Sequence, residues 1–215
     1  MNQRESFFKF VNSTLAVLLQ RRLAEKVQSS DDPDFQPRYV CGMDVAYEEE
    51  TAFATAATFD LDKQVMVGTE KFVGKAPVKY LTGFLGFREG PILLKLVKKL
   101  GERPDVFMID GHGRCHPRRF GIACHVGVAL DKPTIGVAKS FLYGNIVKDA
   151  IYDPQGEIIG RILSSSTGKK FYVSVGHRIS LDTASSIVRE TFEEGHPLPL
   201  RRAHLDSIIL KREIG

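Results

Sequence analysis

Two aspartates in this sequence each follow a short apolar run. Asp110 ends the run Val-Phe-Met-Ile over residues 106–109, and Asp44 ends a similar run over residues 39–43. A run that is apolar at every position is typical of a strand buried on both faces. Open α/β sheets bind their ligands at the carboxyl ends of the strands. Two carboxylates at two such ends therefore predict a site for a cation.

A third acidic residue, Glu89, falls on the apolar face of a predicted helix. It lies four residues after Leu85 and four before Leu93, so its carboxylate is on their side of the helix. A charge that faces the core is costly unless it is paired or binds a metal ion. Clusters of oxygen ligands suit Mg²⁺ or Mn²⁺ better than zinc. The alternative is a surface ion pair between Glu89 and Arg88 or another arginine, and spacing leaves both interpretations open.

The segment 110–121, Asp-Gly-His-Gly-Arg-Cys-His-Pro-Arg-Arg-Phe-Gly, is the densest group of chemically functional residues. Its glycines allow a ligand to approach the backbone, and the N-terminus of the helix that follows can hold a phosphate or a base edge. Arg114, Arg118 and Arg119 add charge that can bind phosphate. The other interpretation is a basic turn exposed to solvent.

The cysteines form no recognisable metal motif. The pairs Cys115-His116 and Cys124-His125 have a spacing that matches no zinc finger or ribbon. Cys41 and Cys124 are better explained as small core residues. An odd number of cysteines in a chain of this size favours a reducing compartment.

The overall composition is that of a folded and mildly basic domain. The chain has 215 residues, with 30 Lys+Arg against 26 Asp+Glu, which permits a polyanionic partner without requiring one. No apolar stretch approaches the ~18 residues of a membrane span. Charged residues interrupt positions 1–30, so no signal peptide is visible. We therefore expect one cytoplasmic domain over residues 1–215, with no membrane contact.

Hydrophobic periodicity predicts the elements that position these residues. We expect an amphipathic helix within residues 1–30, packed on the domain, and then strands over 39–47, 52–61 and 65–73 as an antiparallel meander. The apolar face of the helix consists of Phe7, Val11, Leu15, Leu18 and Leu19.

Strands and helices alternate further along the chain. A helix holding Leu85, Leu93, Leu96 and Leu100 is expected to kink or restart at Pro91. The other expected elements are a strand ending at Asp110, a helix over 120–130, a strand over 134–138 before Lys139, strands around 158–163 and 171–179, and helices from Asp182 and near His204. This order predicts a single α/β domain.

Several blocks, in this order along the chain, resemble the endonuclease V family of nucleases, which cut nucleic acid near deaminated adenine. The resemblance runs from about Tyr39 to about Asp206. The blocks are Gly-Met-Asp-Val-Ala-Tyr at 42–47, Gly-Phe-Leu-Gly-Phe-Arg-Glu-Gly-Pro at 83–91, Asp-Gly-His-Gly at 110–113, His-Pro-Arg-Arg-Phe-Gly at 116–121, Ala-Cys-His-Val-Gly-Val at 123–128, Pro-Thr-Ile-Gly-Val-Ala-Lys at 133–139 and Pro-Leu-Pro-Leu-Arg-Arg-Ala-His at 197–204.

The resemblance implies a ribonuclease H-like α/β fold, with a mixed five-stranded sheet and helices on both faces. It implies that Asp44 and Asp110 bind Mg²⁺, or Mn²⁺, with Glu89 as a further ligand or a base. His204 falls where the family has His or Asp near a second metal position. Asp206 is the alternative residue for that role. Because it lies two residues after His204 on a helix, its side chain should face another direction. Lys139 would stabilise charge on the phosphate, although it can also be read as a solvated lysine.

The implied reaction is metal-assisted hydrolysis of the second phosphodiester 3′ to deoxyinosine, which initiates repair of deaminated adenine. Hypoxanthine would be flipped out of the stack into a tight pocket. The family's pocket corresponds here to Gly83, Leu85, Gly111, His116 and Gly121. Leu85 can equally be a core leucine. We assign phosphate binding to Arg88, Arg118 and Arg119.

One segment departs from the family. Its usual wedge, Pro-Tyr-Ile-Pro, enters the gap left by the flipped base, whereas residues 78–82 here are Val-Lys-Tyr-Leu-Thr. Tyr80 remains, but without prolines the loop is less preorganised. Recognition of inosine in a duplex is then less secure than the nuclease chemistry, and a single strand or RNA would need less from the wedge. Tyr80 could also be an ordinary exposed loop aromatic.

Three alternatives stand beside a deoxyinosine-specific DNA endonuclease. The same chemistry could act on RNA that contains inosine. A relative that only binds nucleic acid is disfavoured, because acids that face phosphates are repulsive unless a cation lies between them. A resolvase or transposase-type nuclease would lack the blocks at 83–91 and 116–121. We expect a monomer that binds nucleic acid.

Overall fold

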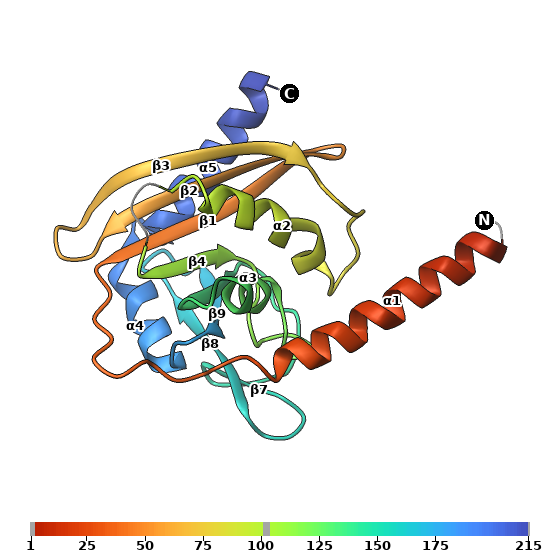
Figure 1. Cartoon of the computed structure of the whole chain (residues 1–215). Helices are drawn as coiled ribbons and strands as arrows, with labels where there is room; N and C mark the ends of the chain where they lie inside the picture. The colour runs from red at the N-terminus through yellow and green to blue at the C-terminus, as the bar shows by residue number, and fades with distance from the viewer. Residues whose placement is uncertain (1–2, 101–103, 215) are drawn as a thin grey trace.

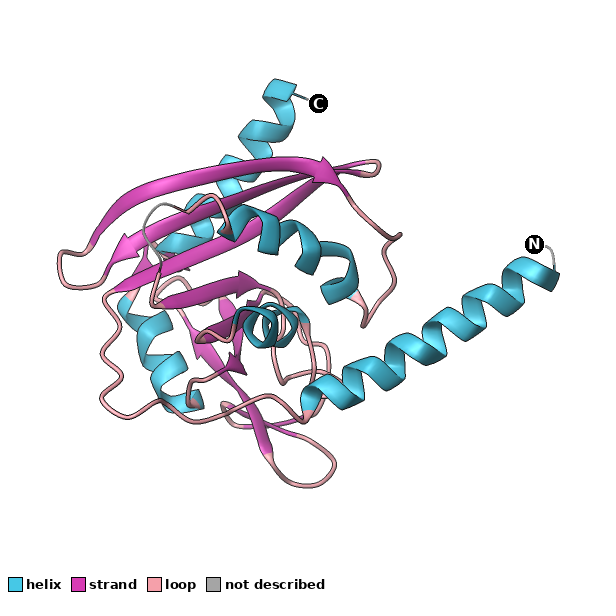
Figure 2. Cartoon of the chain, in the orientation of Figure 1, coloured by secondary structure: helices cyan, strands magenta, loops and turns pink. Residues whose placement is uncertain are grey.

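A mixed β-sheet runs through the whole molecule (Figures 1 and 2). The computed structural model describes residues 3–100 and 104–214. Within them the sheet has nine strands, in the order β3-β2-β1-β4-β5-β9-β8-β7-β6. The strands are β1 (Tyr39–Glu48), β2 (Thr51–Asp60), β3 (Val65–Lys75), β4 (Val106–Asp110), β5 (Thr134–Ala138), β6 (Asn145–Val147), β7 (Ala150–Tyr152), β8 (Ile158–Ser164) and β9 (Lys170–His177).

The central strands are parallel and the outer ones are antiparallel. β1, β4 and β5 are parallel neighbours, and the predicted meander β1-β2-β3 is antiparallel. The predicted α/β class, with helices on both faces, is confirmed, but the five-stranded sheet was too small. Strands β9, β8, β7 and β6 extend it beyond β5. β6 and β7 are three residues each, which is too short for a periodic signal.

Helices cover both faces of the sheet and give it two cores. Helices α2 (Leu85–Val97) and α3 (Ile122–Leu130) enclose one core, which includes residues of β1, β2 and β4. Helices α4 (Leu181–Glu190) and α5 (Leu198–Ile214) enclose the other, which includes residues of β5, β8 and β9. A two-stranded hairpin, β10 (Phe192–Glu193) and β11 (His196–Pro197), leads into α5.

Helix α2 continues through Pro91 and does not start afresh there. A proline inside a helix removes one backbone hydrogen bond. The buried side chains of Ile92, Leu93 and Leu96 hold the second half of α2 against the core and offset that loss. The predicted restart was therefore wrong.

The N-terminal helix α1 (Gln3–Ala24) extends away from the body in Figure 1. Leu15, Leu18 and Leu19 are largely exposed, so the predicted apolar face is not packed along the domain there. The side chains of Phe7 and Val11 lie outside the described residues. Contact with the body comes instead from a polar side chain near the helix end, Gln20, which is buried.

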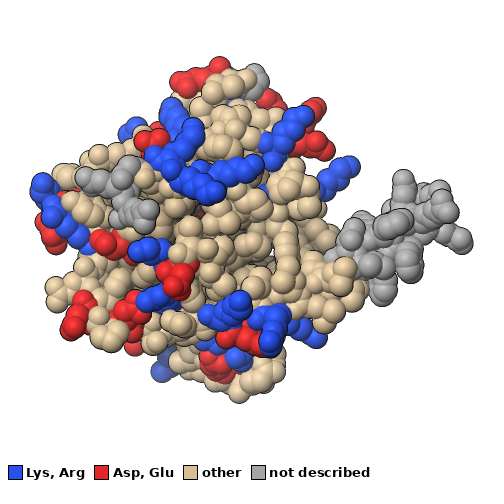
Figure 3. All heavy atoms as spheres, in the orientation of Figure 1, with Lys and Arg blue, Asp and Glu red and all other residues tan. Residues whose placement is uncertain are grey.

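The surface carries charges of both signs, as the composition indicates. On the face shown in Figure 3, Lys and Arg side chains gather over the region of α2 and β3, and acidic side chains lie among them. Among the described residues, no helix is long and apolar enough to cross a membrane. Cys41, Cys115 and Cys124 are free and buried, and burial raises the pKa of each thiol to about 12.

Candidate active site

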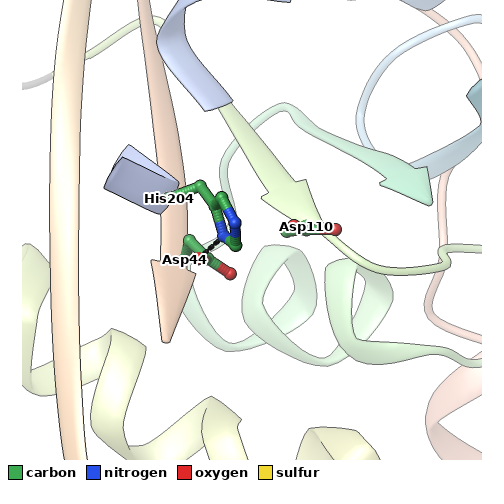
Figure 4. Close-up of side chains that lie close together, drawn as sticks. All are labelled: Asp44, Asp110 and His204. Carbon is green, nitrogen blue, oxygen red and sulfur yellow. Dashed lines mark hydrogen bonds and ion pairs between the residues drawn. The ribbon is translucent and has the colours of Figure 1, made fainter. Parts of the chain in front are cut away.

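Asp44 and Asp110 lie side by side because their strands are parallel neighbours. The register pairs Met43 of β1 with Ile109 of β4, so the next residue of each strand is an aspartate. His204 joins them from α5, which packs across β1. One ligand atom from each of these residues lies within 4.8 Å of the others (Figure 4).

The approach of α5 to β1 depends on a glycine. A Cβ at Gly42 would lie 2.3 Å from the carbonyl carbon of Pro199, in the first turn of α5. Any larger residue at position 42 would therefore displace α5. Because His204 lies farther along the same helix, Gly42 contributes to its placement beside Asp44.

Hydrogen bonds fix the orientation of both aspartates. His204 Nδ1 donates to Asp44 Oδ2 over 2.8 Å. Ser207 Oγ lies 3.1 Å from the same oxygen and 2.9 Å from the carbonyl oxygen of His204, so its one proton is shared between the two acceptors. Lys139, which directly follows β5, donates from Nζ to Asp110 Oδ2 over 2.6 Å. Ser207 was not predicted, because a helical serine 163 residues from its acceptor gives no sequence signal.

Charge and burial act in opposite directions on the pKa values of this cluster. Burial acts to raise the pKa of Asp44, but the hydrogen bond and charge of His204, with Lys139, hold that pKa below its usual value. The bond to Asp44 in turn raises the pKa of His204. Burial and the nearby charge of Asp44 raise the pKa of Asp110.

Glu89 faces this cluster as an unpaired acid. Burial, and then the charges of Asp44 and Asp110, raise its pKa to about 8. No ion pair of Glu89 is found in the described part of the chain, so the predicted alternative of pairing with Arg88 is wrong. Neighbouring carboxylates thus help to raise the pKa values of Glu89 and Asp110, and a divalent cation would stabilise the charged forms of both. A donor set of carboxylates and one imidazole fits Mg²⁺ or Mn²⁺.

A cavity of about 280 Å³ opens beside the acidic cluster. Its lining includes all five residues predicted for the base pocket, Gly83, Leu85, Gly111, His116 and Gly121, together with Tyr80. Asp110 and Lys139 line the same cavity and connect it to the cluster. Sequence reasoning missed other lining residues, among them Gln20, Thr82, His112, Ser140 and Leu142.

The wall of the cavity is held by hydrogen bonds to one carbonyl. Gly83 O accepts from Gln20 Nε2 at 3.0 Å and from Arg118 Nη2 at 2.6 Å. His116 Nε2 lies 3.0 Å from the same oxygen, and His116 Nδ1 accepts from the backbone N–H of Arg118. The proton is therefore on Nε2, which donates to Gly83. Burial lowers the pKa of His116 to about 4 and keeps the ring neutral.

Two further features shape the floor of the cavity. Gly111 has φ +152°, and a Cβ there would lie 2.6 Å from Ile122 Cγ2. A side chain at position 111 would thus collide with the first residue of α3. His112 Nδ1 is buried without a hydrogen-bond partner among the described residues, and burial lowers the pKa of this ring to about 4.

The four arginines named above for phosphate binding all make contacts within the protein, and Arg114 pairs with Glu157 over 2.6 Å. Arg88 is buried, donates to Val78 O over 2.7 Å and stacks on the ring of Tyr47. Arg118 donates to Gln20 and Gly83. Arg119 pairs with Asp153, and also with Glu157 over 2.5 Å. Charge alone does not indicate whether a guanidinium faces solvent or a backbone carbonyl, and phosphate binding by these arginines stays a prediction.

The alternative residue for the second metal position also lies elsewhere, as expected. Asp206 is buried and accepts from Arg202 Nε over 2.9 Å, on a different side of α5 from His204. Of these two candidates, His204 is thus the one that reaches the acids.

Residues 21–205 match the family model described as Endonuclease V. The chain belongs to the endonuclease V family. The predicted resemblance is therefore confirmed, and so is the predicted enzyme class, an endonuclease that hydrolyses phosphodiesters. Endonuclease V of Desulfurococcus amylolyticus is 37% identical over 193 residues, which cover 86% of this chain and 88% of that protein. Endonuclease V of Aeropyrum pernix is 38% identical over 222 residues, covering 100% of this chain and 86% of that protein.

Solved structures of endonuclease V have the same fold. The human protein superposes with a TM-score of 0.84 and 30% identity, over 94% of this chain and 99% of its own. Endonuclease V of Ciona intestinalis, in complex with a 24mer DNA that contains an inosine followed by a ribo-adenosine, gives a TM-score of 0.84 and 27% identity. That match covers 98% of this chain and all of the Ciona chain.

Proposed function

We propose that this endonuclease hydrolyses the second phosphodiester 3′ to deoxyinosine in DNA, with the help of a divalent cation, and so initiates repair of deaminated adenine. One observation carries the proposal. The cavity lined by the predicted base-pocket residues is also lined by Asp110 of the acidic cluster and by Lys139, which is paired with Asp110. A base held in that cavity therefore has its own backbone next to the cluster. The Ciona relative bound to DNA with an inosine supports the same substrate.

Asp44, Asp110 and His204 would hold the cation, with Glu89 as a further ligand or as the group that accepts a proton from the attacking water. When bound, the cation would activate that water and stabilise the charge on the phosphate. The Nζ of Lys139 lies 2.6 Å from an oxygen of Asp110, which places a positive charge beside the proposed cation site. From there Lys139 would bind the phosphate directly. Ser207 would keep Asp44 oriented toward the cation.

The cavity favours a flat and uncharged ring. Leu85, Ile122 and Ala138 provide apolar walls, while glycines leave backbone groups accessible. Helix α2 begins at this cavity without a side-chain cap, so its first N–H groups are available to a carbonyl oxygen of the base. Hypoxanthine has such an oxygen where adenine has an amino group.

The proposal is tested by a gel cleavage assay at matched Mg²⁺. It compares an end-labelled duplex with one deoxyinosine, its adenine control, and single-stranded DNA and RNA versions. The expected product of the first substrate is a single cut one nucleotide beyond the inosine, which EDTA abolishes and Mg²⁺ restores. Equal cutting of the adenine control, or cutting in EDTA, would contradict the proposal.

Asp110→Ala tests the role of the cluster in the same assay. We expect cutting to fall by at least about 1000-fold while binding of the inosine duplex is largely retained, since the cation site is lost but the cavity remains. Asp149→Ala is the matched control, because Asp149 is an exposed acid outside the site. If the Asp110 variant still cuts, Asp110 is not part of the metal site.

A second candidate substrate is RNA that contains inosine. Tyr80 is exposed and its loop has none of the prolines of the family wedge, which favours a substrate that is already unstacked. The RNA arm of the assay separates the two: faster cutting of single-stranded RNA than of duplex DNA would move the substrate to RNA and leave the chemistry unchanged.

A further inference from the structure

A second cavity, of about 310 Å³, lies on the other side of the acidic cluster. Lys139 and His204 line it, so it touches the cluster just as the first cavity does. Its remaining walls come from β5, β9, the β10–β11 hairpin and α5. None of the functions assigned above uses this cavity.

The two cavities open on opposite faces of the sheet. Val137 lines the second cavity and Ala138 lines the first, and consecutive residues of a strand point to opposite faces. Lys139 follows directly at the sheet edge and lines both cavities. The cluster thus stands at this edge, between one cavity on the α2–α3 side and another on the α5 side.

This arrangement sets a path for the substrate strand. If a base occupies the first cavity and the scissile phosphate lies at the cluster, the chain must cross the edge of the sheet there. The nucleotide that follows the cut then lies on the α5 side. We propose that the second cavity binds the nucleotide on the 3′ side of the scissile phosphodiester, with its base against the apolar wall. The inference rests on the proposed function for the direction of the strand.

The lining of the second cavity fits such a nucleotide. Phe171, Leu200 and Leu205 provide an apolar surface, and its volume is close to that of the first cavity. Apolar and aromatic surfaces bind any base through its face, without reading sequence. This property suits a repair enzyme, because the neighbours of a deaminated base vary.

Cationic side chains at the rim fit the phosphates of that nucleotide. Arg201 lines the cavity and, among the described residues, forms an ion pair with Glu194 over 2.6 Å at the surface. A surface pair of this kind contributes little stability and can exchange for a phosphate. His196 also lines the cavity, and its Nε2 accepts a hydrogen bond from the Nζ of Lys169 over 2.9 Å, so that Lys169 and not the imidazole carries the positive charge there.

The test combines a change in the substrate with a change in the protein. The observed cut is first mapped on an intact deoxyinosine duplex. The residue directly 3′ of that cut is then replaced by an abasic tetrahydrofuran, with its phosphates kept. We expect kcat/KM of the wild-type enzyme to fall about fivefold or more, the range of one lost stacking contact.

Leu205→Ala removes part of the apolar wall of the second cavity. The Leu205 side chain is 47% exposed, so it is not a core residue. We expect this variant to lose about threefold in kcat/KM on the intact substrate and nothing on the abasic one. Ile209→Ala is the matched control, since Ile209 is 45% exposed on the same helix and does not line the cavity. It should leave both substrates unchanged.

Each remaining outcome overturns a distinct statement. If the wild-type enzyme cuts the intact and the abasic substrate equally, or if Leu205→Ala slows both by the same factor, the second cavity does not bind this nucleotide. In that case the proposed function still stands. If the wild-type enzyme fails to cut the intact deoxyinosine duplex at all, the proposed function falls, and the subsite falls with it.

Discussion

His204 and Ser207 act together because they are three residues apart on α5. Residues at this spacing share a helix face, and both side chains reach the same oxygen of Asp44. Asp206 is one residue away from Ser207 and faces Arg202 instead. The spacing therefore explains why the histidine, and not the neighbouring carboxylate, completes the cluster.

Glu89 should lower the stability of the metal-free protein at neutral pH. Burial, and then the charges of Asp44 and Asp110, raise its pKa to about 8 in the folded chain, from the ordinary glutamate value of 4.5 that applies in the unfolded chain. Between these values the folded state binds a proton that the unfolded state has lost, so stability falls as pH rises. We expect the Tm of Glu89→Gln in EDTA to exceed that of the wild type by a margin that grows between pH 4.5 and 8.

The measurement is a thermal melt at several pH values. A difference of 1 kcal/mol corresponds to about 2–4 °C for a chain of this size. Added Mg²⁺ should stabilise the wild type more than the variant, because a cation bound to the native state shifts the equilibrium toward folding. A Tm difference that is the same at pH 4.5 and pH 8 would mean that Glu89 is not held in this electrostatic environment.

Tyr80 should matter most for duplex substrates. Its side chain is 62% exposed and lines the base cavity, so it is accessible to the gap left by a flipped base. We expect Tyr80→Ala to lower kcat/KM about tenfold or more on the inosine duplex, and to have a smaller effect on a single strand, which needs no strand separation. Equal losses on both substrates, measured by gel cleavage, would argue against a wedge.

At the scale of the elements, periodicity located most of the fold. The strands from Tyr39, Val65 and Thr134 begin where their apolar patterns predict, and β4 ends at Asp110. The strand assignments also predicted that Asp44 and Asp110 lie close together, because the carboxyl ends of parallel strands meet at one edge of the sheet. What periodicity could not supply were contacts between distant elements. Three features depend on contacts that no local sequence pattern predicts. They are the packing of α5 against Gly42, the hydrogen bonds donated to Gly83 O, and the second cavity.

The N-terminal helix is the clearest case. Its leucines predicted an apolar contact, yet the buried residue is Gln20, which donates to Gly83 O and to Phe120 O and accepts from Arg118 Nε. Both carbonyls belong to segments that line or adjoin the base cavity. A polar residue, and not the predicted apolar face of this helix, was thus the informative position.

Gln20→Leu should loosen the base cavity. The change leaves Arg118 Nε and Phe120 O without their partner, which costs about 1–3 kcal/mol of stability. We expect a lower ratio of cutting between inosine and adenine duplexes, because the Gly83 wall is less firmly held. Leu18→Ala is the control, since Leu18 is 55% exposed on the same helix. Loss of stability with an unchanged inosine-to-adenine ratio would make Gln20 a structural anchor only.

At the scale of the whole molecule, one sheet serves both cores. Strands β1 and β4 carry residues into both the α2–α3 core and the α4–α5 core, so neither core can form without strands that the other also needs. We propose on this basis that residues 1–215 behave as one domain. Calorimetry should give a single unfolding transition, with a calorimetric enthalpy equal to the van't Hoff enthalpy. Two separable transitions would contradict the proposal.

Because all three natural thiols are buried, a fluorophore can be attached selectively to a cysteine introduced near the substrate strand. A thiol with a pKa of about 12 is almost entirely protonated at neutral pH and reacts slowly with alkylating dyes. A cysteine introduced at an exposed position, as in Tyr80→Cys or Leu205→Cys, would then be labelled alone on the natural background. A fluorophore at the first position would report arrival of the flipped base, and one at the second would report departure of the 5′-phosphorylated product.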